Sequence, residues 1–187
     1  TKLIVQGITG REGQFHTKTM IEYGTNVVGG VTPGKGGQEI FGLPVFNTVK
    51  EAVEATGANA TIIFVPAKFT PASVMEALDA GLKTVLTISE HTPVHEMMKC
   101  YWVARQKGAK LYGPNSFGII SPGKSKAGFM ANRIFKEGNI GVMTRSATNG
   151  YESVYMMSCA NMGQSTVVGI GGDMIPGSTF IDVLPDF

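Results

Sequence analysis

A glycine-rich turn follows the first apolar run of the chain. Leu3–Val5 leads directly into Gly7, Gly10 and Gly13. Glycines at such a turn let the backbone reverse tightly and approach a ligand, and the following helix presents free N–H groups to a pyrophosphate. The spacing is GxxGxxG, whereas dinucleotide-binding proteins typically have GxGxxG. The turn alone is therefore compatible with a phosphate site or with an ordinary strand–helix connection.

Lys35 is the only charged residue in the loop 32–37, which follows the second predicted strand. Nicotinamide-binding domains usually carry an acidic residue near the end of this strand, where it binds the ribose hydroxyls. No acidic residue is present there, and a lysine favours a phosphate over a free ribose. The pattern predicts a ligand with a pyrophosphate and a further phosphate on its ribose, which fits coenzyme A and, less well, NADP.

Short β-branched runs alternate with helical patterns in the first part of the chain, which is typical of a parallel sheet in an α/β fold. The predicted strands are Leu3–Val5, Val27–Val31, Thr61–Val65, Thr84–Ile88 and Lys110–Tyr112. The predicted helices are Arg11–Tyr23, Thr48–Ala55, Pro71–Ala80 and Pro93–Lys107. Ligands of such sheets bind outside the carboxyl ends of the strands, so the loops after the first four strands are predicted to form one site.

A second strand–turn–helix unit follows the predicted loop Gly113–Gly123. Ile140–Thr144 is a predicted strand, and it is followed by a small polar turn, a helix over Tyr151–Asn161 and a strand over Thr166–Ile170. The turn again presents backbone N–H groups to an anion. Two strands rarely make a stable domain, so we expect residues outside this chain, another subunit, or both to complete this unit.

Composition excludes several classes of protein. The net charge is +2 and the lysines are scattered, so the chain lacks the basic stripe of a nucleic-acid-binding protein. No apolar run is long enough to span a bilayer, so no membrane partner is predicted. Cys100 and Cys159 have no partners at metal-binding spacing and are predicted to be buried thiols, which fits the cytoplasm or the matrix of a mitochondrion or other organelle. His91 and His95 lack a third ligand, and no metal site is predicted.

Six segments together resemble the α subunit of succinyl-CoA synthetase (succinate–CoA ligase), in the same order and with similar spacing: Gly7–Gly13, Gly29–Gly37, Gly42–Phe46, Gly113–Asn115, Arg145–Ser146 and Gly169–Asp173. The resemblance covers nearly the whole chain. It implies an N-terminal Rossmann-like CoA-binding domain over residues 1–122, followed over 123–187 by the first part of a flavodoxin-like ligase domain.

The resemblance also implies an activity. The family uses a nucleoside triphosphate, succinate and CoA to form succinyl-CoA, nucleoside diphosphate and phosphate, a reaction of the tricarboxylic acid cycle. A phosphohistidine carries the phosphoryl group. The implied partner is a β-type subunit, which would hold the Mg-nucleotide, because no ATP-grasp-like site is visible in this sequence.

The resemblance implies roles for particular residues. Tyr151 is expected to help hold the carboxylate substrate. The phosphate site is expected at the turn that contains Ser146, Ala147 and Thr148. The CoA-binding positions implied by the family pattern are Thr9, Gly10, Arg11, Glu12, Lys35, Ile88, Ser89 and Glu90.

Some positions depart from the family pattern. Ser116-Phe117 replaces a usual Cys-Pro, Ala147 replaces a usual glycine, and Lys68 replaces a usual proline. The family's phosphorylated histidine lies beyond the position that corresponds to Phe187, so the chain is expected to be truncated before it. His16, His91 and His95 lack the family's His-Ala-Gly context. No catalytic residue is therefore identified in this chain, which is expected to be inactive alone.

Two alternatives remain open. The first is a non-catalytic CoA-binding module, against which the incomplete second sheet argues, because a stand-alone module is not expected to expose unpaired strand edges. The second is an NADP-dependent oxidoreductase domain, which Lys35 also permits. Comparing CoA, dephospho-CoA and NADP as ligands tests the oxidoreductase alternative.

Overall fold

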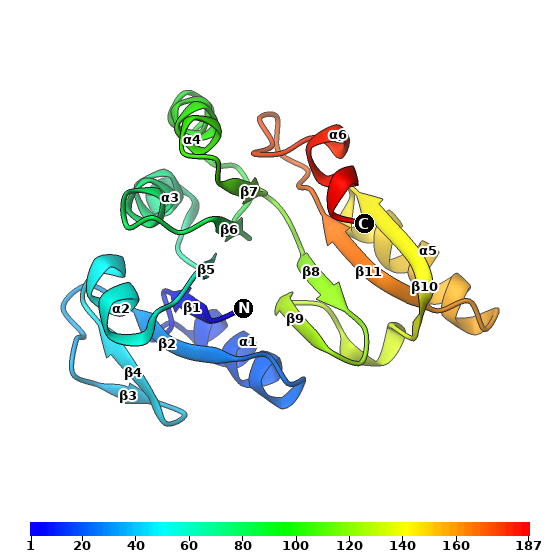
Figure 1. The fold of residues 1–187 in the computed structure, drawn as a ribbon, viewed down its shortest axis with the longest axis horizontal. Helices are drawn as coiled ribbons and strands as arrows, with labels where there is room; N and C mark the ends of the chain where they lie inside the picture. The colour runs from blue at the N-terminus through cyan, green and yellow to red at the C-terminus, as the bar shows by residue number, and fades with distance from the viewer.

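Seven strands form the larger of two sheets in the computed structural model, which describes residues 1–187 (Figure 1). The strand order is β3-β4-β2-β1-β5-β6-β7, and only the β3–β4 pair is antiparallel. The α/β class and the Rossmann-like parallel sheet are thus confirmed. The strands are β1 (Leu3–Gln6), β2 (Val27–Val31), β3 (Glu39–Ile40), β4 (Leu43–Phe46), β5 (Ala60–Ile63), β6 (Thr84–Thr87) and β7 (Lys110–Tyr112).

Four helices of this first part lie close to their predicted positions. Three of them, α2, α3 and α4, pack on one face of the large sheet, where they bury Ile4 of β1 and Val85 of β6. The neighbours of Ile4 along β1, Leu3 and Val5, point to the opposite face, as the two-residue repeat of a strand requires. That face is covered by the first helix. The helices are α1 (Arg11–Glu22), α2 (Val49–Thr56), α3 (Thr70–Asp79) and α4 (Val94–Gln106).

The second sheet has four strands, so the prediction of only two was wrong. Its order is β10-β11-β8-β9, with β10 parallel to β11 and the other pairs antiparallel. The predicted loop contains β8, which begins at Gly118 and is followed by Pro122 and Gly123, and these turn-forming residues obscured the strand pattern. Gly118 pairs with Gly128 of β9. A Cβ on Gly118 would lie 2.0 Å from the carbonyl oxygen of Ala127, so this close pairing requires glycine. The strands are β8 (Gly118–Ser121), β9 (Ser125–Gly128), β10 (Glu137–Thr144) and β11 (Gln164–Gly169).

Two helices accompany the second sheet, α5 (Ala147–Cys159) and the short α6 (Phe180–Val183). Helix α5 covers one face, where Phe117, Val154 and Val167 are buried together. It begins four residues earlier than predicted because Ser146 caps it. Single 3₁₀ turns occur at Ala67–Phe69, Asn132–Ile134 and Leu184–Asp186.

The other face of the second sheet packs against the large sheet, on the side of α1 (Figure 1). Val168 and Ile170, at the end of β11, share a buried cluster with Leu3 and Val5 of β1. The second sheet therefore takes the place of a helix layer over part of the first.

The expected domain boundary at 122/123 falls in the turn between β8 and β9, and both strands belong to the second sheet. The division at this point, and the flavodoxin-like character of residues 123–187, stay predictions. None of the helices combines the length and the apolarity that a membrane-spanning helix requires.

The two thiols differ in their surroundings. Cys100 is buried on α4, and burial raises its pKa to about 11. Cys159, at the end of α5, is exposed, so the prediction of two buried thiols was wrong for this residue. The error arose because the absence of metal-binding partners in the sequence does not show whether a thiol is buried or exposed.

Candidate functional site

A cavity of about 530 Å³ lies at the carboxyl ends of the parallel strands. The glycine turn contributes Gly7, Thr9 and Gly10, and the loop after β2 contributes Thr32 and Pro33. The remaining wall comes from the segment after β5 and from α3, through Phe64, Val65, Pro66, Phe69, Ala72, Ser73 and Glu76. The structure therefore brings together loops that the sequence predicted to meet.

A second cavity of about 460 Å³ adjoins the first, because Phe64, Val65 and Pro66 line both. Its other walls are Glu12 and His16 of α1, Ile88 and Ser89 after β6, and Phe129 after β9. Both volumes are in the range of small-molecule sites, and together they form an elongated space between the glycine turn and the second sheet. Five of the eight predicted CoA-binding residues line this space: Thr9, Gly10, Glu12, Ile88 and Ser89.

The glycine turn leaves the start of α1 open to a ligand. Gly10 is the N-cap residue, and no side chain caps the helix, so the first N–H groups of α1 lack intrahelical acceptors. Gly7 has a φ of 79°, which glycine adopts readily. A Cβ on Gly13 would lie 2.1 Å from the carbonyl oxygen of Gly7, so only glycine lets the helix approach the turn this closely. The geometry suits an anion such as a pyrophosphate.

The other three predicted CoA-binding residues do not line either cavity. Arg11 and Glu90 are exposed at the edges of the site. Lys35 is also exposed, three residues beyond Thr32, whose carbonyl oxygen accepts a hydrogen bond from the Lys35 N–H at 3.0 Å. Because Thr32 and Pro33 line the cavity, the Lys35 loop begins at the site.

The loop 88–90 is fixed to its neighbours. The Ser89 hydroxyl donates a short hydrogen bond to the carbonyl oxygen of Val65, at the rim of both cavities. The Ser89 carbonyl oxygen accepts a hydrogen bond from the backbone N–H of Asn115 at 2.9 Å. The loop is thus held by the segment after β5 on one side and by the segment that leads into the second sheet on the other.

His16 lies where the second cavity meets a further one lined by Phe129 and Arg133. Its ring stacks on Phe64 with centroids 5.3 Å apart, and its Nε2 lies 3.5 Å from a carboxylate oxygen of Glu12. Burial lowers the pKa of the imidazole, although the nearby Glu12 carboxylate acts in the opposite direction. The His16 ring therefore packs against Phe64 and makes a polar contact with Glu12.

The predicted phosphate turn lies at the start of α5. The Ser146 hydroxyl accepts a hydrogen bond from the N–H of Asn149 at 3.3 Å, so this helix, unlike α1, has a side-chain cap. Ala147 and Thr148 are the first two residues of the helix, and Thr148 is exposed. Their binding of a phosphoryl group stays a prediction.

Tyr151 does not line any of the cavities described above. Its hydroxyl lies 3.5 Å from the carbonyl oxygen of Phe129, and its ring packs near Phe117 and Phe135. Burial raises the pKa of the phenol. Since Phe129 lines the second cavity, Tyr151 lies one residue behind its wall. Direct contact between Tyr151 and a substrate stays a prediction.

Several lining residues were missed by sequence reasoning. Phe64 and Phe129 are apolar residues at strand ends, and their only signal is position at the edge of a sheet. Glu76 lies on α3, where its carboxylate accepts a hydrogen bond from the N–H of Val49 at 2.8 Å. This contact between two helices has no local signature in the sequence.

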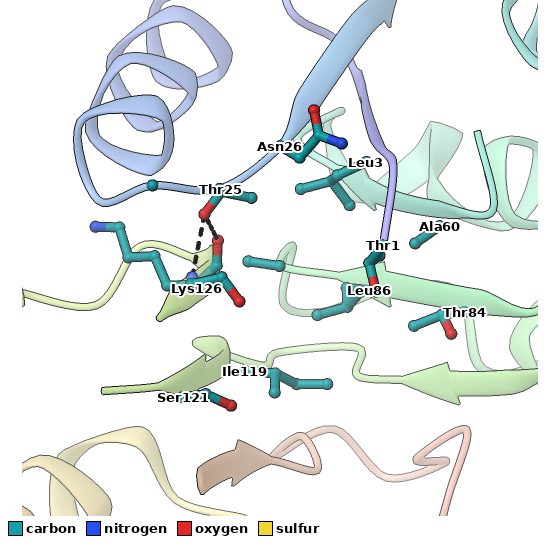
Figure 2. Close-up of a pocket in the computed structure, with 13 residues that line it drawn as sticks. Thr1, Leu3, Thr25, Asn26, Ala60, Thr84, Leu86, Ile119, Ser121 and Lys126 are labelled. Carbon is teal, nitrogen blue, oxygen red and sulfur yellow. Dashed lines mark hydrogen bonds between the residues drawn. The ribbon is translucent and has the colours of Figure 1, made fainter. Parts of the chain in front are cut away.

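A separate cavity of about 430 Å³ lies between the two sheets, at the amino ends of β1, β5 and β6 (Figure 2). Leu3, Ala60 and Thr84 line it from the large sheet, and Ile119 and Ser121 line it from β8. It contains no predicted site residue. It lies at the opposite ends of the strands from the glycine turn, so we regard it as separate from the candidate site.

The chain is similar in sequence and in fold to several known proteins. A family model described as a CoA binding domain matches residues 1–91. Subunit alpha 2 of the ADP-forming succinate–CoA ligase of Archaeoglobus fulgidus is 55% identical over 184 residues, which are 98% of this chain and 64% of that protein. The malate–CoA ligase subunit alpha of Methylorubrum extorquens is 53% identical over 191 residues, covering 100% of this chain and 64% of that protein.

A solved structure supports the fold. ATP citrate lyase from Methanothrix soehngenii, in complex with citrate and coenzyme A, matches 97% of this chain and 33% of its own with a TM-score of 0.84 at 24% identity. The chain spans 64% of the length of the two relatives named above. Over its whole length, the chain is similar in sequence to the α subunits of succinate–CoA and malate–CoA ligases.

Proposed function

We propose that this chain is the CoA-binding part of the α subunit of an acid–CoA ligase that forms succinyl-CoA or the CoA ester of a related dicarboxylate. The observation that carries the proposal is the pair of adjoining cavities beside the uncapped start of α1, where five predicted CoA-binding residues meet. The relatives support it, since their names specify ligation of succinate or malate to CoA.

In this proposal the pyrophosphate of CoA lies over the first turn of α1, at Gly10–Glu12. The helix N–H groups and the helix dipole offset its charge. Lys35 then binds the additional phosphate on the ribose, because its loop starts at the cavity wall and carries a flexible cation. The pantetheine chain extends into the second cavity, past Ile88 and Ser89.

The chemical steps need groups beyond those in this chain. The turn Ser146–Thr148, at the start of α5, would face the phosphoryl group. Tyr151 would help to hold the carboxylate substrate. None of His16, His91 and His95 is proposed as the phosphoryl carrier. A β-type subunit would supply the Mg-nucleotide site, and the relatives' names favour ADP formation. We place the protein in the cytoplasm or an organelle matrix.

The test compares CoA with dephospho-CoA by isothermal titration calorimetry. The wild-type protein should bind CoA more tightly than dephospho-CoA, by about 1 kcal/mol or more, because a charge-assisted contact is lost with the 3′-phosphate. Lys35→Glu should remove this difference. Lys99→Glu, on the exposed side of α4 and outside both cavities, serves as the charge-matched control and should keep it.

The competing functions give different results in the same assay. Equal affinity of the wild-type protein for CoA and dephospho-CoA would refute the role of Lys35. Binding of NADP as tight as that of CoA, with both weakened equally by Lys35→Glu, would favour an oxidoreductase domain. CoA binding without acyl-CoA formation, in the full-length subunit assembled with its partner, would identify a non-catalytic module.

A further inference from the structure

The loop Gly171–Asp173, which follows β11, contacts the loop that begins at Ile88 through one carboxylate. Asp173 accepts hydrogen bonds from the N–H of Thr92 and from the Thr92 hydroxyl, both at 3.1 Å, and from the N–H of His91 at 3.4 Å. Thr92 is buried. The carboxylate therefore holds the segment immediately beyond the predicted CoA-binding residues Ser89 and Glu90.

The same loop is held from the other side by Arg145, the residue before the predicted phosphate turn. Its guanidinium donates from Nε to the carbonyl oxygen of Gly171 at 3.1 Å. Its Nη2 donates to the carbonyl oxygens of Asp173 at 2.7 Å and Gly172 at 3.5 Å. One side chain thus binds three consecutive carbonyl groups.

Backbone contacts complete the connection. The N–H of Gly172 donates to the carbonyl oxygen of Asn115 at 3.0 Å, and the N–H of Asn115 donates to the carbonyl oxygen of Ser89 at 2.9 Å. The loop 171–173 is therefore joined at several points to the segment 89–92 and, through Arg145, to the start of α5. Three segments that are distant in sequence form one hydrogen-bonded unit.

We propose that Asp173 and Arg145 are positioning residues that hold the CoA-binding loop and the phosphate turn in a fixed relative placement. This inference rests on the proposed function, because it assumes that CoA binds at Ser89 and a phosphoryl group at Ser146. Neither Asp173 nor Arg145 needs to touch CoA. The carboxylate fixes the loop 88–92 relative to the loop 171–173, and the guanidinium fixes the loop 171–173 relative to α5.

The test is a double-mutant cycle in the complete ligase, assembled from the full-length subunit and its partner. The measured quantity is the KM for CoA. Asp173→Asn loses part of the acceptor capacity, and Arg145→Lys keeps the charge but loses the multiple donors of the guanidinium. Each single substitution should raise this KM by about three- to tenfold, an effect in the range of one or two lost hydrogen bonds.

Non-additivity distinguishes a connected unit from two separate structural effects. The fold increase in KM of the double variant should be smaller than the product of the two single increases, because Arg145 acts on the CoA loop through the loop 171–173, which Asp173 connects directly to His91 and Thr92. A fold increase in KM for the double variant equal to the product of the two single fold increases would overturn the proposal. Unchanged KM values in both single variants would overturn it as well.

Controls separate this test from misfolding and from failure of the proposed function. Thr92→Val removes only the hydroxyl donor to Asp173 and should raise the KM by about two- to threefold even where Asp173→Asn does not fold; no change would contradict the proposal. Asp79→Asn, at an exposed surface ion pair with Lys107, should leave the KM unchanged. A wild-type ligase that does not use CoA would refute the proposed function, whereas normal use of CoA with additive variants would refute only the positioning role.

Discussion

The three glycines of the first turn have different physical roles, although the sequence presents them as one motif. Gly7 supplies a positive φ, and Gly13 allows the helix to lie against the turn. Gly10 has an ordinary φ of −73°, and a Cβ there would lie 3.3 Å from the carbonyl oxygen of Gly7. A side chain at Gly10 therefore strains the fold least of the three, and Gly10 lines the first cavity.

This difference predicts that two substitutions separate stability from binding. Gly13→Ala should lower the free energy of unfolding by about 1–3 kcal/mol, because its Cβ would collide with backbone. Gly10→Val should lower stability by less than Gly13→Ala, because its Cβ contact with the Gly7 carbonyl oxygen is longer. It should reduce the affinity for CoA at least about tenfold, or about 1.4 kcal/mol, because its methyl groups obstruct the pyrophosphate. Thermal unfolding followed by circular dichroism and titration calorimetry with CoA give the two quantities. Unchanged CoA affinity in Gly10→Val would contradict the placement of the pyrophosphate.

The residues of the site differ in how far they could be predicted. Gly10 and Ser89 line the cavities and could be predicted because a glycine turn and a loop at a strand end each have a physical meaning in a parallel sheet, whereas phosphate binding by Lys35 stays a prediction. Phe64 and Phe129 could not be found this way, since an apolar residue at a strand end is usually part of the core. They line the site because two chain segments far apart in sequence meet there.

At the scale of elements, regular alternation predicted the parallel strands and their helices, whereas the short hairpins were missed. The strands of the pairs β3–β4 and β8–β9 include charged residues, glycine or proline, so they lack the β-branched runs that mark the parallel strands. Strand β9 is an edge strand, and its outer side is not left unpaired. The Thr25 hydroxyl donates to the carbonyl oxygen of Lys126 at 2.6 Å and accepts from the N–H of Lys126 at 3.1 Å (Figure 2).

Thr25 therefore acts as a side-chain replacement for a neighbouring strand. Thr25→Val keeps the shape but leaves both backbone groups of Lys126 without this partner, and should lower the free energy of unfolding by about 1–3 kcal/mol. Thr25→Ser keeps the hydroxyl and should retain most of the stability. Urea unfolding of the two variants measures the difference. Unchanged stability in Thr25→Val, with a loss in Thr25→Ser, would show that the methyl group, and not the hydrogen bonds, is responsible.

At the scale of the whole molecule, the two sheets share one buried cluster. Leu3, Val5 and Ile62 of the large sheet contact the same apolar region as Val168 and Ile170 of the second. The sequence did not show this arrangement, because alternation reveals which residues are buried but not which sheet they face. A shared core makes the stability of each unit depend on the other, so the chain should unfold in a single transition.

The single tryptophan tests this coupling, because Trp102 lies on α4 and is part of the first unit. Ile170, 1% exposed, belongs to the segment after β11, so Ile170→Ala should cost about 2–5 kcal/mol. The unfolding midpoint reported by Trp102 fluorescence should fall together with that from circular dichroism. Ile181→Ala, at a position 82% exposed, should leave both midpoints unchanged. The alternative result is an unchanged midpoint from Trp102 fluorescence together with two transitions in the circular dichroism curve. This result would mean that the two sheets unfold independently, and that the buried contact between them adds little to the stability of the large sheet.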